Sequence, residues 1–179
     1  MSYPTYLEAI SQGFPLVEAG VEGDGSVYET IYLTNEYDVD RAPLPTKESL
    51  EPIRRSIAQT RAWVLIQAER DRRRSGGVKV GINWYHSDDT SRIQQIGLVM
   101  FGAAMPPNIS WKTMAGTFVT MTPALAMGIF QTTAGSEQAI FARAEYHRAM
   151  MLASAAPELY NFSGGWPLTY EEWAALPPP

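Results

Sequence analysis

The spacing of apolar residues predicts a long helix from about residue 49 to 75. Apolar side chains recur there at near-helical intervals, at Leu50, Ile53, Ile57, Val64 and Ala68. Ser49 can cap this helix, and Pro52 falls near its start, where a missing N–H costs little. Gly76 and Gly77 follow the last helical position and are expected to end it.

Further helices are predicted in the second half of the chain. One runs from about 89 to 104 and carries Ile93, Ile96 and Met100 on one side. Another starts at Pro123, with Thr122 as its cap. The sequence TTAGS at 132–136 is expected to divide this segment into two helices. The second of them has one face lined by Ile140, Ala144, His147 and Met151.

Two segments alternate in the period of two that is typical of strands. They are residues 27–34, after a glycine-rich turn, and residues 78–86, with Val78, Val80, Ile82 and Trp84 on one face. Two short extended runs at 108–123 flank a glycine turn and predict a hairpin. The pattern therefore indicates an α+β fold with about four helices, a small antiparallel strand or hairpin element, and an N-terminal extension that contains β structure.

The chain divides by composition into three predicted parts. Residues 1–45 form an extension with one strand, closed by the proline-containing linker DRAPLP. Residues 46–165 form the helical domain, and residues 166–179 form a tail rich in aromatic residues and proline. We expect this tail to run over a surface without forming an element.

Composition narrows the possible functions. The chain has 179 residues, a formal net charge of -5 and no cysteine. This acidic balance disfavours general binding to polyphosphates, and the lack of cysteine excludes disulfides, thiolate nucleophiles and cysteine zinc sites. The N-terminus does not resemble a secretory signal and no apolar run is long enough for a membrane span, so we expect a soluble protein in the cytoplasm, without membrane insertion.

The stretch HSDD at 86–89 has two interpretations. His86, Asp88 and Asp89 could ligate a metal ion, but a further ligand would have to come from elsewhere, and His147 is the best candidate. The stretch also connects a predicted strand to a predicted helix, where Ser87, Asp88 or Asp89 could cap the first turn. The sequence favours this helix-capping joint, so no metal ligand is assigned.

Patterns that identify enzymes are missing from the sequence. It contains no Gly-x-Ser-x-Gly elbow, no phosphate-binding loop and no dinucleotide-binding glycine motif. The adjacent pair Glu171 and Glu172 falls in the tail and is expected to be solvated. We therefore expect a protein that is not an enzyme, with no catalytic residue and no cofactor; a small hydrolase or metal-dependent enzyme using His86 is the alternative.

The basic run RDRRR at 70–74 also allows two readings. With Arg54, Arg55 and Arg61 it could form a patch for nucleic acid, with Trp84 and Tyr85 as stacking residues. Arginines at the C-terminal end of a helix also complement its dipole and pair with acids such as Glu69 and Asp71. The acidic composition favours the second reading, and no nucleic-acid partner is expected.

The aromatic residues supply the candidate partner contacts. Trp166, Tyr170 and Trp173 either pack the tail onto the domain or anchor a partner. Tyr28 and Tyr32 lie on the predicted N-terminal strand, which could extend the sheet of a partner.

Three segments carry a resemblance to a known family. They are GGVKVGINWYHSDDTSRIQ, NISWKTMAGTFVTMTPALA and QAIFARAEYHRAM, which contain a Gly-Val joint at 77–91, a Trp-Lys-Thr hairpin at 111–119 and a helical histidine at 147. Over about residues 53–165 the chain resembles a family of short tailed-bacteriophage proteins whose shared domain has no assigned activity. Some members resemble tail-fibre assembly proteins, which also carry a Trp-Pro near the C-terminus, here Trp166-Pro167.

The resemblance implies a non-enzymatic phage tail protein. Its expected partner is the tail fibre or another tail protein, in a homo-oligomer or another symmetric complex. It would act as a chaperone in fibre assembly or attachment, in the host cytoplasm during assembly. The alternative is a stoichiometric structural component of the tail or baseplate in the virion.

Overall fold

The structure is a computed structural model that describes residues 2–15, 17–34 and 43–177. Its α-helices are α1 (Tyr6–Gly13), α2 (Lys47–Arg74), α3 (Asp89–Phe101), α4 (Pro123–Ala153) and α5 (Tyr170–Ala174). Its strands are β1 (Ala19–Val21), β2 (Ile31–Leu33), β3 (Val78–Val80), β4 (Asn83–Tyr85), β5 (Ser110–Lys112) and β6 (Phe118–Thr120). Short 3₁₀ helices are η1 (Tyr28–Thr30), η2 (Gly102–Ala104) and η3 (Pro157–Leu159). The predicted α+β class, with a helical core and small antiparallel sheets, is confirmed.

Each pair of strands forms a separate two-stranded antiparallel sheet within the described residues. Ala19 pairs with Leu33 in the first sheet, Val78 with Tyr85 in the second and Ser110 with Thr120 in the third. Sheets this small are marginal alone, so each depends on the helices against which it packs.

The chain forms two compact units. The first comprises residues 1–65 and 148–161, and the second comprises residues 66–147 and 162–179. The predicted boundaries at 45 and 165 do not coincide with this division, because α2 and α4 each contribute residues to both units. Residues 40–42 of the predicted linker and residues 178–179 of the predicted tail lie outside the described residues.

The first unit packs α1 and the β1–β2 sheet around the start of α2. Its buried core consists of Tyr6, Ala9, Ile10, Ile31 and Leu50. Thr5 and Glu8 form a reciprocal capping box at the start of α1, and Arg61 of α2 donates to Glu8 at 2.7 Å. Arg55 ties α2 to the end of α4 by donating to the carbonyl oxygens of Leu152 and Ser154.

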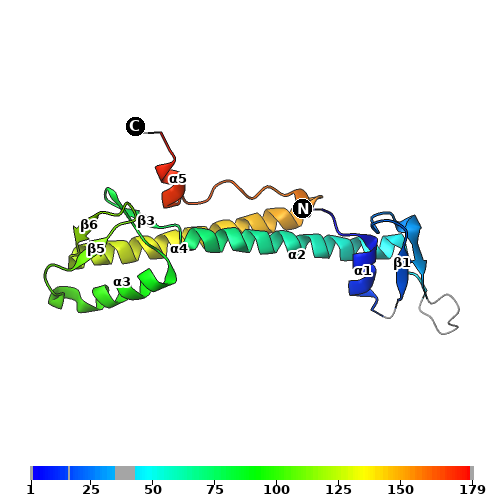
Figure 1. The fold of residues 1–179 in the computed structure, drawn as a ribbon, viewed down its shortest axis with the longest axis horizontal. Helices are drawn as coiled ribbons and strands as arrows, with labels where there is room; N and C mark the ends of the chain where they lie inside the picture. The colour runs from blue at the N-terminus through cyan, green and yellow to red at the C-terminus, as the bar shows by residue number, and fades with distance from the viewer. Residues whose placement is uncertain (1, 16, 35–42, 178–179) are drawn as a thin grey trace. The chain divides into compact units, whose positions relative to one another are not determined.

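The second unit surrounds the N-terminal part of α4 with two hairpins and α3 (Figure 1). Its core consists of Val78, Tyr85, Leu98, Met121, Ala126 and Ile129. The backbone N–H of Met114 donates to the carbonyl of Trp84, which joins the β5–β6 hairpin to the β3–β4 hairpin. The hairpin predicted at 108–123 is confirmed.

Helix α2 agrees with its predicted range, although details of its start and packing differ. It begins at Lys47, and Thr46 accepts from the N–H of Ser49 through its hydroxyl, so Ser49 is not the cap. Pro52 is therefore inside the helix and beyond the first turn. Val64 is exposed, whereas Ile66 is fully buried, because the buried stripe shifts along the helix.

Helix α4 is continuous, so the predicted break at 132–136 was wrong. A glycine inside a helix costs only about 1 kcal/mol relative to alanine, which packing along a long helix readily offsets. The hydroxyl of Thr132 also donates to the carbonyl of Gly128, one turn earlier in the helix, so this polar side chain is satisfied within α4. The predicted face of Ile140, Ala144, His147 and Met151 is buried, as expected.

Three predicted segments needed correction. The strand at 27–34 is shorter, because residues 28–30 form η1 and only Ile31–Leu33 pair. The strand at 78–86 is a hairpin, since Gly81 has φ +61 and reverses the chain between β3 and β4. The tail contains α5, which begins with a capping box between Thr169 and Glu172.

Candidate functional site

The joint at residues 86–89 connects β4 to α3. Asp88 is the N-cap: its side chain accepts from the backbone N–H of Ser91 at 3.0 Å and from the Ser91 hydroxyl at 2.7 Å. These hydrogen bonds hold the pKa of Asp88 below its usual range, so the carboxylate stays ionised at the positive end of the helix dipole. Asp89 occupies the first turn of α3, and its carboxylate lies 3.5 Å from the guanidinium of Arg74.

Ser87 does not cap α3. Its buried hydroxyl donates to the carbonyl of Arg74 at 2.6 Å and accepts from the N–H of Gly77 at 2.9 Å. It therefore connects the end of α2, the start of β3 and the end of β4. Sequence reasoning missed this role because the bonded groups are backbone atoms ten or more positions away.

The two histidines lie in different surroundings. His86 is exposed, while its backbone carbonyl accepts from the Gln95 amide at 2.7 Å. His147 is buried, its Nε2 lies 3.0 Å from the carbonyl oxygen of Gly164, and its ring is 5.2 Å from that of Trp166. In the described part of the chain, no group of three or more histidine and carboxylate side chains is arranged to hold a metal ion.

The basic run at the end of α2 is paired with carboxylates. Arg70 contacts Asp71, Arg72 and Arg73 contact Glu69, and Arg74 contacts Glu137 at 2.9 Å. The hydrogen bond from Arg72 is the main reason that the pKa of Glu69 is lowered. The ion pairs predicted with Glu69 and Asp71 are therefore present.

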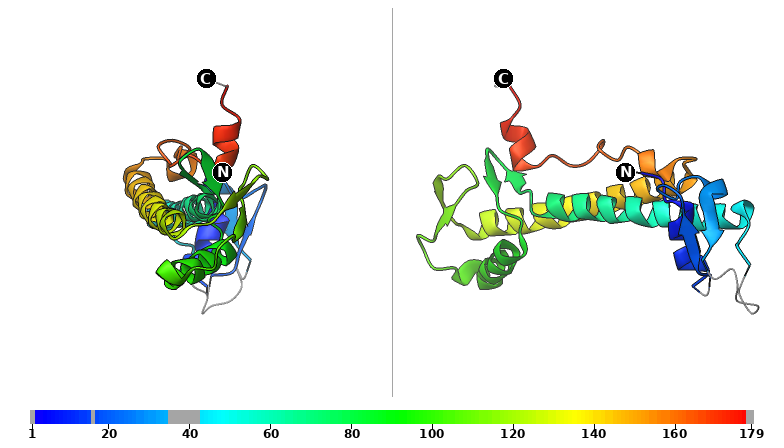
Figure 2. Two further views of the ribbon diagram at one scale, coloured as in Figure 1. Left: turned by 90° about the vertical axis from the view of Figure 1, so that its left-hand side faces the viewer. Right: turned by 45° about the vertical axis from the view of Figure 1, so that its right-hand side comes forward.

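Arg73 fixes the C-terminal tail to the second unit. Its buried guanidinium donates to both carboxylate oxygens of Glu172, at 2.6 and 3.1 Å, and to the carbonyl of Pro167 at 2.8 Å. The backbone N–H of Tyr170 donates to the carbonyl of Gly76. Figure 2 shows α5 beside the β3–β4 hairpin in both views. The expectation that Glu172 is merely solvated is wrong.

The tail aromatics pack inward. Trp166 is 9% exposed and donates its indole N–H to the carbonyl of Phe162 at 2.7 Å, so it is not an available anchor for a partner. Tyr170 and Trp173 are half-buried and lie 6.0 and 5.8 Å from the ring of Trp84. The sequence allowed two roles for these residues, packing of the tail onto the domain or anchoring of a partner. In the structure they pack the tail onto the domain.

The N-terminal sheet presents the other predicted contacts. Tyr28 is half-buried, with its hydroxyl donating to the carbonyl of Pro45 and its ring at 5.5 Å from Tyr6. Tyr32 is 51% exposed and lies across Gly20, where a side chain would collide with its ring. Tyr32 is thus the predicted contact residue most accessible to a partner.

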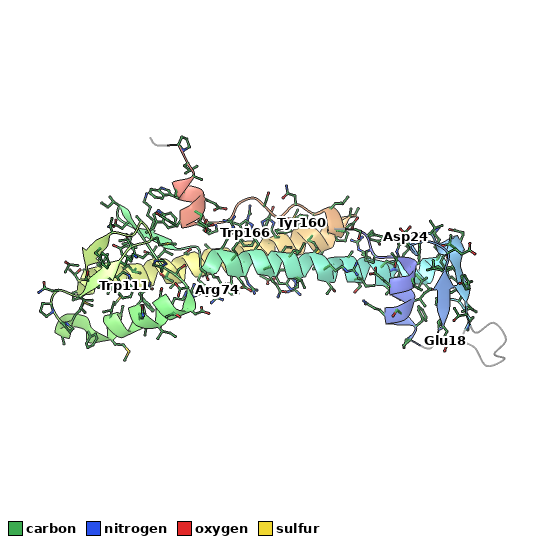
Figure 3. The ribbon with its side chains drawn as sticks, in the orientation of Figure 1. Glu18, Asp24, Arg74, Trp111, Tyr160 and Trp166 are labelled. Carbon is green, nitrogen blue, oxygen red and sulfur yellow. The ribbon has the colours of Figure 1, made fainter. Side chains whose placement is uncertain are left out.

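An open groove lies beside this sheet in the first unit. Its volume is about 700 Å³, and it is lined by Leu7, Ile10, Ser11, Pro15, Val17, Glu18, Ala19 and Thr34. Glu18 and Asp24, labelled in Figure 3, lie beyond the two ends of β1. The groove lies between α1 and the start of β1 and offers both apolar and polar side chains.

The fold and these surfaces define an α+β protein with a helical core and small two-stranded sheets, in which Arg55 joins α2 to the end of α4 and Arg73 holds the C-terminal tail. Among the described residues, no helix has an apolar stretch long enough to span a bilayer.

The model of the family described as Domain of unknown function (DUF4376) matches residues 57–164, which is more than half of the chain. The chain therefore belongs to this family. No match was found among curated proteins or among solved structures.

Proposed function

We propose that this chain is a non-enzymatic tail protein of a tailed bacteriophage that binds the tail fibre or the distal tail, acting in fibre assembly or attachment. The motifs at 77–91 and 111–119, which resemble short phage tail proteins, support this setting. The observation that carries the binding role is the β1–β2 sheet, which has two strands, an exposed tyrosine and an adjacent groove.

The hydrogen bonding of this sheet determines which backbone groups face a partner. Thr34 donates to Glu18 at 2.9 Å and Glu22 donates to Thr30 at 3.1 Å. Because hydrogen-bonded and non-hydrogen-bonded pairs alternate, the backbone groups of Ala19 and of Leu33 point away from the opposite strand. An extended segment of a partner could pair with these outward groups, as in other complexes formed by strand addition.

The outward position of Leu33 permits a direct test of binding. Leu33→Pro removes an outward N–H and leaves the bonds between β1 and β2, since proline is tolerated at an edge position that does not donate to the ladder. Leu33→Ala is the matched control, because it shortens the same side chain and keeps the N–H. Each variant is co-expressed with the fibre and distal-tail chains of the phage that encodes it.

We expect Leu33→Ala to retain a fibre or distal-tail chain and Leu33→Pro to lose it. A corresponding Ala19→Pro variant tests the edge of β1. Equal retention by all three variants would exclude strand addition at this sheet, and failure of the unchanged protein to retain any tail chain would contradict the proposed function itself.

The second candidate is a stoichiometric structural component of the virion tail, which the same resemblance supports. Peptide mass spectrometry of purified particles, with a known tail protein as reference, separates the two. A fixed copy number that follows tail symmetry identifies a structural part. Absence from particles that nevertheless need the gene for infectivity identifies an assembly factor, and absence together with unaffected infectivity would refute both.

A further inference from the structure

Helix α3 turns an apolar side to the solvent. Ile93 is 71% exposed and Met100 is 81% exposed, and Ile96 between them is also exposed. The buried residues of this helix are Gln95 and Leu98, on the opposite side. Positions 93, 96 and 100 follow the 3–4 spacing of a helix-packing seam.

The exposed side continues onto α4 of the same unit. Ile96 and Phe130 line one hollow between the two helices, and Met127 is exposed one turn before Phe130. Figure 1 shows α3 beside the N-terminal part of α4. Apolar side chains scattered singly need no explanation, whereas a contiguous patch on one face does.

The size of this patch fits a protein interface. The exposed fractions of Ile93, Ile96, Met100, Met127 and Phe130 give an apolar area on the order of 500 Å², taking roughly 150–200 Å² for a fully exposed side chain of this size. A standard interface buries about 800 Å² on each partner, and homodimer interfaces are about 65% apolar. The patch supplies the apolar area that one side of such a dimer requires.

The sequence of α3 is complementary to itself in the antiparallel direction. About a twofold axis between positions 96 and 97, Ile96 meets Gly97 of the second copy and Ile93 meets Met100 of the second copy. No side chain or backbone lies within 4 Å of the Cβ position at Gly97, so this side of the helix is open to a bulky residue. A twofold interface requires just this kind of self-complementarity.

The charges of α3 are also compatible with this pairing. No charged residue occurs from Ile93 to Phe101, so a twofold axis would not bring like charges together on this face. Arg92, which precedes this run, is already held by Glu137 at 2.7 Å. This face offers no charge that a charged partner could pair with, but it offers apolar contacts to a second uncharged helix.

We propose that two copies of this chain associate through the exposed side of α3, as an antiparallel helix pair centred between Ile96 and Gly97, with Met127 and Phe130 of α4 at its border. The interface is isologous, because each copy uses the same residues. It goes beyond the proposed function and does not depend on it, since it uses a different surface from the β1–β2 sheet.

The first test compares two charge-introducing variants by sedimentation velocity of the full chain. Ile96→Glu places a charge at the centre of the interface, where Ile96 is 45% exposed, while Ile82→Glu places one at a more exposed turn of the same unit, where Ile82 is 87% exposed. We expect dimers for the unchanged chain and for Ile82→Glu, and monomers for Ile96→Glu. A monomeric unchanged chain, a dimeric Ile96→Glu variant or a trimer would overturn the proposal.

The second test determines the direction of the pair by cysteine cross-linking, because the chain has no cysteine of its own. In the antiparallel pair, positions 93 and 100 of opposite copies are neighbours, whereas two copies of position 93 are separated by seven residues, or about 10 Å along the axis. A disulfide needs Cβ atoms about 3.5–4.5 Å apart. Mixing Ile93→Cys with Met100→Cys should therefore give the mixed disulfide, and neither variant alone should cross-link.

A mixed disulfide from the mixture alone supports the antiparallel pair. Efficient cross-linking of each variant with itself would indicate parallel helices, and no cross-linking in any sample would show that the two sides do not meet. Either result contradicts the proposal. Far-UV circular dichroism of each variant confirms that the helices are intact before the oligomeric state is compared.

Discussion

Arg73 is the residue whose replacement should destabilise the second unit most clearly. In Arg73→Met the aliphatic part of the side chain is largely kept, but four hydrogen bonds are lost: one to Glu69 at 2.6 Å, two to Glu172 and one to the carbonyl of Pro167. The cation–π contact with Trp166, 5.5 Å from the ring centre, is lost as well. The only cation then left within 4 Å of the Glu172 carboxylate, among the described residues, is Arg72, at 3.7 Å.

The expected loss follows from the burial of these groups. Removing one partner of a fully buried ion pair costs about 3–5 kcal/mol, because the other charge remains without compensation. Arg73 is 7% exposed, but the carboxylates of Glu69 and Glu172 keep some access to water, which reduces the penalty. We therefore expect a loss of about 2–4 kcal/mol in the free energy of unfolding of this unit.

Urea denaturation followed by tryptophan fluorescence measures this loss, since Trp84, Trp166 and Trp173 surround the affected contact. Arg72→Met is the matched control: Arg72 pairs with the same Glu69 and lies 3.7 Å from Glu172, but its side chain is 46% exposed, so its loss should be at most about 1 kcal/mol. Limited proteolysis should cut the tail earlier in Arg73→Met than in Arg72→Met. Equal losses in both variants would refute the view that Arg73 fastens the tail.

Three further predictions concern the joint, the buried histidine and one glycine. Asp88→Ala should lower the free energy of unfolding, measured by urea denaturation, by about 1 kcal/mol, because it removes the helix cap. His86→Ala should change it by less than about 0.5 kcal/mol, and a larger effect would contradict the capping interpretation. Burial lowers the pKa of His147 below 6.5, so the unfolded chain takes up this proton first as the pH falls, and the free energy of unfolding should begin to decrease at about pH 6.5. In His147→Gln this first part of the decrease should be absent, and only the decrease at lower pH, caused by carboxylates such as Glu69, should remain. Gly77→Ala should lower the melting temperature, because Gly77 has φ +88 and an added Cβ would collide with Met114. If Met114→Ala, introduced together with Gly77→Ala, restores full stability, then the positive φ does not contribute to the destabilisation.

Helical periodicity predicted the elements well where one apolar face is buried. The face of Ile140 and Met151 on α4 follows from spacing alone, and so does the range of α2. The expected break at 132–136 is absent because small polar residues lower helix propensity only slightly, whereas α4 has buried residues at intervals from Ala126 to Met151.

The contacts of the candidate surfaces were less predictable. Tail aromatics in a proline-rich segment indicate either packing or partner binding, and the choice depends on Arg73, which lies more than ninety positions away in the sequence. The roles of Ser87 and of Arg73 consist of bonds to distant backbone atoms. Local sequence patterns carry no signal for such contacts, whereas the Asp88 cap bonds to a residue three positions away and could be predicted from the sequence.

The orientation of α3 shows why its apolar side faces outward. Three polar contacts fix the first turns of this helix: Arg92 donates to the carbonyl of Ser87 at 2.6 Å and pairs with Glu137, and Gln95 donates to the carbonyl of His86. Once these bonds are formed, Gln95 and Leu98 must face the core, and Ile93 and Met100 must face away. Leaving Gln95 buried without its partner would cost about 1–3 kcal/mol, which is comparable to the cost of leaving one isoleucine exposed and favours the orientation that satisfies the amide. The joint at 86–89 therefore does more than begin a helix, because it selects the side of α3 that remains available to a second copy.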